Sequence, residues 1–178
     1  MAWAVNFNDI SLDEKIEFLG KYLEMNSDKV NMQKAYREVL SFIVGGLYVC
    51  PKYRYVSIDA DNLLKKNGYL EIPHTKKSKN PPLKELTIEH TIPTKLMVDY
   101  LLSKDKSELS RQELKHIFTI VSGTALITKK ENNLLRENKL NHNLPDGITV
   151  EDIIQGQAKH SCRYDYINIQ YKEFNPYD

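Results

Sequence analysis

Two short segments constrain the fold of this chain more than any other feature. In Thr87–Pro93, a strand-like run ends at Glu89-His90, and a proline then forces the chain to turn. In Leu126–Asn133, a second strand-like run leads into a helix whose first turn is polar. Adjacent strand residues point to opposite faces, so Glu89 and His90 can share one site only if the chain turns there. The two segments predict a strand, a second strand and a helix, with the Glu-His pair facing the helix.

Hydrophobic spacing and capping residues predict that most of the chain is helical. Ser11–Glu14 is a capping box, and Ile16, Leu19 and Leu23 follow it at helical spacing. The remaining elements are predicted from similar signals. They are a helix from about Ser27 to Gly45-Gly46, helices beginning at Ser57, Thr94, Ser110 and Thr128, a polar loop at His74–Pro82, and strands at Leu86–His90, Gly123–Thr128 and Arg163–Tyr171. The predicted fold class is α+β, a predominantly helical domain with an embedded ββα element.

Length and charge limit the classes of protein to which the chain can belong. At 178 residues it is long enough to bury a substantial core as a single domain, residues 1–178. The 25 Lys and Arg nearly balance the 24 Asp and Glu, which does not suggest a non-specific nucleic-acid binder, a class that is usually clearly basic. Contact with phosphate would therefore need a local basic patch, or a homodimer or protein partner that completes the surface.

The two cysteines and the N-terminus bear on metal binding and on location. Cys50 and Cys162 are far apart and have no CxxC spacing, which excludes a zinc ribbon and predicts no structural zinc. The two could form a single disulfide, but a reduced cytosolic chain is the favoured interpretation. The N-terminus lacks the basic and apolar regions of a signal peptide. The longest apolar run, Phe42–Val49, is too short to span a bilayer. These features predict a cytoplasmic protein with no membrane partner.

The order of the two central segments resembles the HNH, or ββα-metal, endonuclease family. The resemblance rests on the Glu-His-x-x-Pro run that begins at Glu89 and on the Thr-Lys-x-Glu helix start at Thr128. It extends over residues 52–171, which would form the HNH-like nuclease part, with residues 1–50 as a helical N-terminal part. Two features depart from the family pattern: Thr94–Ser122 intervenes between the strands, and the middle Asn of the motif has no counterpart at Ser122–Ala125.

The resemblance implies a role for each motif residue. His90 takes the position of the general base, Glu89 that of the carboxylate that binds one divalent metal ion, and Asn132 that of the helix ligand. Glu131, Asn133 and His142 are secondary candidates, and Glu131 is also the expected capping partner of the threonine at the helix start. Carboxylate and amide oxygens suit hard ions such as Mg²⁺ or Mn²⁺. A neutral imidazole can accept a proton from water at working pH.

Basic residues on both sides of the motif are candidates for contact with the DNA backbone. Two lysines in the first turn of a helix oppose its dipole unless they meet an anion, which favours a phosphate there. Charge runs are also common on solvated surfaces, and buried arginines also bind acidic residues within a domain, so both readings stay open. The candidates for binding phosphate or DNA are Arg54, Lys76, Lys77, Lys79, Lys129, Lys130, Arg136 and Arg163.

The resemblance implies a metal-dependent DNA endonuclease that hydrolyses phosphodiester bonds and leaves a 5′-phosphate and a 3′-hydroxyl. Restriction, phage defence and a phage-encoded nuclease are equally compatible with the sequence. The alternative is a non-catalytic DNA- or protein-binding module that retains the ββα shape, and a third reading is a helical interaction protein. Convergence of Glu89, His90 and Asn132 on one site distinguishes the nuclease from the other two.

Overall fold

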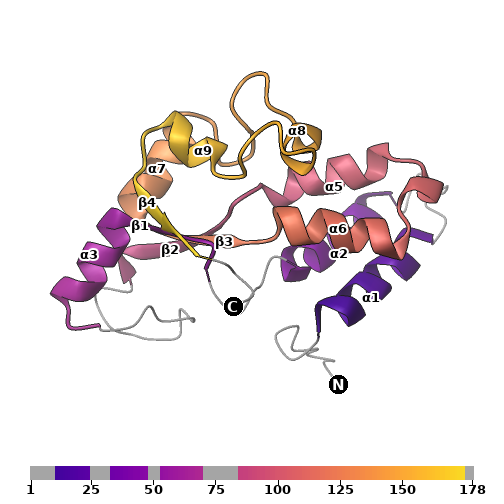
Figure 1. Ribbon diagram of the computed structural model, residues 1–178, viewed down its shortest axis with the longest axis horizontal. Coiled ribbons are helices and arrows are strands. Elements are labelled where there is room, and N and C mark those ends of the chain that lie inside the picture. The colour runs from indigo at the N-terminus through magenta and orange to yellow at the C-terminus, as the bar shows by residue number, and fades with distance from the viewer. Residues whose placement is uncertain (1–10, 25–32, 48–52, 70–83, 175–178) are drawn as a thin grey trace.

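A computed structural model of the protein describes residues 11–24, 33–47, 53–69 and 84–174. The described residues form two halves that lie side by side, a small mixed sheet with its covering helices and a bundle of helices (Figure 1). The predicted α+β class is therefore confirmed.

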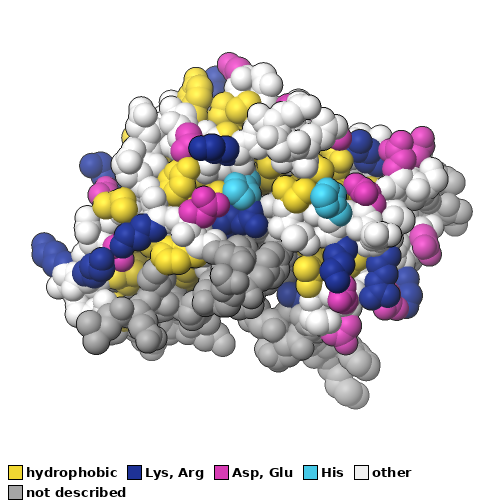
Figure 2. All heavy atoms as spheres, viewed as in Figure 1, with side chains coloured by type: hydrophobic (Ala, Val, Ile, Leu, Met, Phe, Trp, Pro, Cys, Tyr) yellow, Lys and Arg dark blue, Asp and Glu magenta, His cyan; other side chains and the backbone are white. Residues whose placement is uncertain are grey.

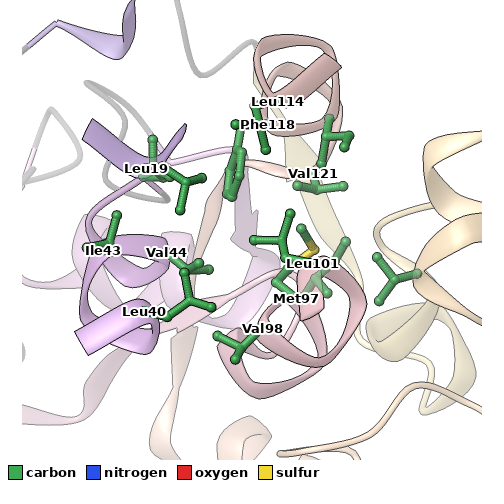
Figure 3. Packing of buried hydrophobic residues seen from close by; sticks show 14 of the residues in the cluster. Leu19, Leu40, Ile43, Val44, Met97, Val98, Leu101, Leu114, Phe118 and Val121 are labelled. Carbon is green, nitrogen blue, oxygen red and sulfur yellow. The ribbon is translucent and has the colours of Figure 1, made fainter. Parts of the chain in front are cut away.

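The helical half is held together by apolar side chains spaced three or four residues apart on each helix. Figure 3 shows these side chains pointing toward one another, among them Leu19, Leu40, Met97 and Phe118, each no more than 1% exposed. The first helix begins with the predicted capping box, in which the Ser11 N–H donates to a carboxylate oxygen 2.9 Å away. The elements of this half are α1 (Leu12–Glu24), α2 (Gln33–Leu47), α5 (Thr94–Ser103), η3 (Lys106–Glu108), α6 (Arg111–Val121) and α8 (Val150–Ile154).

The sheet half contains four described strands in the order β2-β3-β1-β4. Strands β2 and β3 are antiparallel, with Leu86 opposite Thr128 at one end of the ladder and His90 opposite Thr124 at the other. Strand β1 is parallel to β3 and antiparallel to β4. The bounds are β1 (Tyr55–Ser57), β2 (Leu86–His90), β3 (Thr124–Thr128) and β4 (Tyr171–Glu173).

Helices cover both faces of this sheet because its side chains alternate between two apolar clusters. On one face Val56 and Leu126 pack with α3 (Ile58–Lys66). On the other face Ala125 and Ile127 pack with Leu135 of α7 (Lys129–Glu137) and with α9 (Cys162–Tyr166). Since Glu89 pairs with Ala125, it belongs to the face that α7 and α9 cover.

The order of β2, β3 and α7 agrees with the predicted strand, strand and helix, and α5 and α6 form the helical insertion between the strands. The prediction of a strand at Arg163–Tyr171 is wrong over most of its length. Residues Cys162–Tyr166 form the short helix α9, and its Tyr164 packs against the sheet with Tyr55 and Leu135. The strand begins only at Tyr171.

Other predictions differ from the structure at an element end, fall outside the described residues, or miss short elements. Helix α2 continues past the predicted stop at Gly45-Gly46 to Leu47. Its predicted start near Ser27 and the loop predicted at His74–Pro82 lie outside the described residues. Strand β1 and helix α8 were not predicted from the sequence, since each is too short to show a period.

Over the described ranges, none of the helices combines the length and the apolar character that crossing a bilayer requires.

Candidate functional site at the end of strand β2

The chain leaves the sheet directly after His90 and enters the helical half. The Thr91 N–H donates to the Gly123 carbonyl (3.1 Å), and the Thr91 hydroxyl donates to the same carbonyl (3.1 Å), so the turn is bonded to the segment that precedes β3. Pro93 then serves as the N-cap residue of α5. The predicted turn is present, and it places Glu89 and His90 at the junction between the two halves.

A cavity of about 590 Å³ opens at this junction, and both Glu89 and His90 line it. Two adjacent strand residues therefore face one space, as the sequence requires for a shared site. On the face drawn in Figure 2, Lys and Arg side chains lie among acidic ones over both halves of the molecule. The other lining residues come from the start of α5, from α7 and from the segment after it: Pro93, Thr94, Lys95, Arg136, Asn141 and His142.

A larger cavity of about 940 Å³ lies between α5 and residues 143–151. It contains neither Glu89 nor His90, and its walls are rich in carboxylates, which repel phosphate. One lysine of this wall, Lys104, is already bonded to Glu151 at 2.8 Å. The chemistry expected from the sequence therefore belongs to the smaller cavity. The carboxylates of the larger one come from Asp99, Asp105, Glu108, Asp146 and Glu151.

His90 is held as a neutral imidazole. Burial of the ring, helped by the positive charge of Arg163, lowers the pKa of His90 below its ordinary value of 6.5. The ring Nδ1 lies 3.3 Å from the Thr94 hydroxyl, which fixes one side of the ring. A neutral imidazole that lines a cavity can accept a proton there at neutral pH.

Glu89 lies beside a buried guanidinium. Its Oε2 is 3.9 Å from Nη2 of Arg163, a side chain that is 0% exposed. Nη1 of the same arginine donates to the His90 carbonyl at 2.8 Å. Arg163 therefore touches the motif from inside the protein, and it does not reach solvent, where it would have to be to clamp a phosphate.

Asn132 is buried on α7 and is not among the residues that line the cavity, so the structure brings Glu89 and His90 to one space without it. The residue is 7% exposed, and its Oδ1 has no hydrogen-bond partner among the described residues. It lies one helical turn before Arg136, which lines the cavity. A buried polar atom without a partner is rare and usually meets a water molecule or an ion. Asn132, which the resemblance assigns to metal binding, is the residue of α7 that shows this feature.

Carboxylate and amide oxygens are the kind of donor that suits a hard divalent ion such as Mg²⁺, whose shell water and substrate phosphate usually complete. Of the two expected ligands, Glu89 lines the cavity and Asn132 does not. Among the described residues, no group of three or more His, Cys, Asp and Glu side chains is placed to hold a metal ion.

Glu131 is committed to structure rather than to the cavity. Its Oε2 accepts hydrogen bonds from the Thr128 N–H (2.7 Å), the Thr128 hydroxyl (2.8 Å) and the Ser57 hydroxyl (2.7 Å). The predicted capping box is thus present. Of the other secondary candidates, Asn133 is exposed on α7, whereas the exposed side chain of His142 lines the cavity with His90.

The basic candidates are spread over separate places. Arg136 lines the cavity, but the exposed Lys129 and Lys130 lie at the opposite end of the β2–β3 ladder, where Leu86 pairs with Thr128. That end is four residues from His90, or about 14 Å along the strand. Lys76, Lys77 and Lys79 lie outside the described residues.

Arg54 is also buried and lies elsewhere. Its guanidinium donates to the carbonyls of Ile120 (2.6 Å) and Thr119 (3.3 Å) at the C-terminal end of α6, and the residue is 7% exposed. These contacts satisfy carbonyls that a helix end leaves without partners. Sequence reasoning missed Lys95, an exposed residue that lines the cavity, although its place two residues after the motif proline was a usable signal.

Comparison of the chain with protein-family models, with curated proteins and with solved structures finds no match.

Proposed function

We propose that the protein is a metal-dependent nuclease that hydrolyses phosphodiester bonds of DNA, with the cavity at the end of β2 as its active site. The observation that carries the proposal is the meeting of the Glu89 carboxylate and the neutral His90 imidazole in one cavity. The order of β2, β3 and α7, and the buried oxygen of Asn132, support an embedded ββα-metal element.

The cavity offers groups for the negative charge of the phosphate and for the proton that the attacking water loses. Lys95 and Arg136 lie on its wall and suit a phosphate, whose negative charge they would offset. His90 then accepts the proton of the water that attacks phosphorus, while the Thr94 hydroxyl holds the ring. The bond from phosphorus to the leaving 3′-oxygen breaks, and that oxygen takes up a proton from solvent. The products are a 5′-phosphate and a 3′-hydroxyl.

Glu89 and Asn132 would hold one divalent ion, Mg²⁺ or Mn²⁺, through their side-chain oxygens. A bound ion supplies stabilisation of the negative charge that develops on the phosphate and on the leaving oxygen. Because Arg163 already offsets part of the Glu89 charge, we expect weak binding of the ion by the free protein, strengthened when phosphate is present.

Cleavage assays at varied metal concentration test the proposal. Purified protein is incubated with plasmid DNA and with labelled single- and double-stranded oligonucleotides, in Mg²⁺ or Mn²⁺, and then with a chelator. We expect cleavage that the chelator abolishes. Glu89→Gln and Asn132→Ala should cut poorly and be partly rescued by more metal, whereas the control Asn133→Ala, one residue further along α7, should behave as wild type.

The binding-module alternative predicts a different result from the same assay. DNA that is bound but not cut at any concentration of either metal would contradict the nuclease proposal. Equal metal affinity of wild type, Glu89→Gln and Asn132→Ala, measured by calorimetry, would remove those two residues as ligands.

A further inference from the structure

Arg163 makes contacts at the active-site cavity that its position in the sequence does not suggest. It lies on α9, 73 residues after His90, and is 0% exposed. Its Nη1 donates to the His90 carbonyl at 2.8 Å and approaches the Thr91 carbonyl at 3.4 Å. The guanidinium therefore binds the main chain at the point where β2 ends and the turn begins.

The same guanidinium faces the carboxylate of the neighbouring residue. Its Nη2 lies 3.9 Å from Glu89 Oε2, and within the described residues Nη2 and Nε have no hydrogen-bond partner. A buried cation whose donors are only partly satisfied usually lowers stability compared with an apolar side chain of similar size. Arg163 is thus poorly explained as a device for stability alone.

Its position does explain how two adjacent strand residues face one space. In a regular strand the side chains of Glu89 and His90 point to opposite faces, yet both line the cavity. Arg163 is in contact with both residues, through the carboxylate of the first and the carbonyl of the second. It therefore fixes the orientation of the peptide unit that joins the two functional side chains to the turn.

We infer that Arg163 is a positioning residue, which holds the end of β2 so that the Glu89 carboxylate and the His90 imidazole open on the same cavity. The inference rests on the proposed function for its effect on cleavage, but not for its effect on the main chain. Lysine cannot replace this residue, because a single ammonium group lacks the rigid fork that reaches a carbonyl and a carboxylate from one plane.

Arg54 offers a matched control. It is also buried, at 7% exposed, and it also donates to two main-chain carbonyls, but these belong to the end of α6. Arg54→Lys therefore removes the same kind of contact from the same kind of environment. A loss of kcat or of amide protection that both variants share reflects lower general stability. A loss confined to Arg163→Lys reflects a change at the cavity.

The test combines kinetics with amide hydrogen exchange. In Arg163→Lys we expect kcat on DNA to fall on the order of 10- to 100-fold, with KM within about twofold, because a displaced base and ligand affect the chemical step. Exchange of the Thr91 amide should be at least about tenfold faster than in wild type. Arg54→Lys should keep the wild-type kcat and the wild-type exchange at Thr91.

Retention of wild-type kcat and of Thr91 protection in Arg163→Lys would overturn the inference, as would an equal loss of kcat in Arg54→Lys. If Arg163→Lys does not fold, Glu89→Gln examines the same ion pair from its partly buried carboxylate. Faster exchange over residues 89–91 in that variant supports the inference, and unchanged exchange overturns it. If the wild-type protein cuts no DNA, the proposed function fails, while the exchange comparison still decides the role of Arg163.

Discussion

Replacing Glu131 by alanine is expected to destabilise the protein far more than the same change at Asp152, although each residue closes a capping box. Asp152 Oδ2 accepts from the Thr149 N–H (2.7 Å) and hydroxyl (2.6 Å) at an exposed helix start. Glu131 Oε2 makes the equivalent contacts with Thr128 and accepts in addition from Ser57, which is 0% exposed. The difference between the two variants isolates the buried contact.

The magnitude follows from the donors that lose their acceptor. In Glu131→Ala the Ser57 hydroxyl and the Thr128 N–H each lose a charged acceptor, and water reaches this 6%-exposed position poorly. An unsatisfied buried donor costs about 1–3 kcal/mol, so we expect a loss of about 3 kcal/mol in the free energy of unfolding. At Asp152 water replaces the carboxylate, and the loss should be much smaller.

Urea unfolding followed by circular dichroism measures both losses. With an m-value of about 2 kcal/mol/M, the midpoint for Glu131→Ala should fall by about 1.5 M. The midpoint for Asp152→Ala should fall by less than about half of that. Equal shifts in the two variants would refute the reasoning, since they would show that the Ser57 contact adds nothing to the cap.

Three further changes have defined outcomes. Gly123→Ala should lower the free energy of unfolding, measured in urea, by about 2–3 kcal/mol, because φ is +149° and the new Cβ would lie 2.9 Å from a side-chain atom. Gly45→Ala has no described atom within 4 Å of its Cβ and should raise the free energy of unfolding by about 0.5–1 kcal/mol. A loss in both would contradict this. Burial lowers the pKa of folded His160 to about 4 from 6.5, so the unfolded chain takes up the proton first and stability falls as pH drops through this window. His160→Gln should remove about 1–2 kcal/mol of that fall, allowing for the partly exposed ring, and an unchanged slope would refute the assignment. Alanine at both Lys129 and Lys130 should reduce the slope of log K for DNA binding against log salt concentration by about one unit per lost contact. The kcat should be retained, because both lysines lie far from the cavity. An unchanged slope would show that they belong to solvated surface.

Local signals were enough to predict the elements that carry the candidate site. Strand β2 ends at His90 and α7 begins after Thr128, because a motif proline and a capping box act within a few residues of these points. The same reasoning assigned Glu131 to the cap, where it lies. Asn132 is buried with an unpartnered oxygen but does not line the cavity, and its role as the helix ligand stays a prediction.

Contacts between distant parts of the chain could not be predicted from the sequence. Nothing near Arg54 or Arg163 shows whether a guanidinium meets a phosphate or a carbonyl, and their partners lie 66 and 73 residues away. Antiparallel pairing of β2 with β3 sets Lys129 at the far end from His90, a reversal that residue order does not reveal. The segment around Arg163 alternates like a strand, but it forms helix α9, which packs against the sheet through Tyr164.

The rate of DNA cleavage by His90→Ala under single-turnover conditions is the most direct test of a nuclease in which this imidazole is the general base. His116→Ala, a change on the exposed face of α6, is the control for loss of a histidine. We expect a fall on the order of 10²–10⁴ in rate for His90→Ala, with DNA binding and circular dichroism retained, and a wild-type rate for His116→Ala. Wild-type cleavage by His90→Ala would contradict the account.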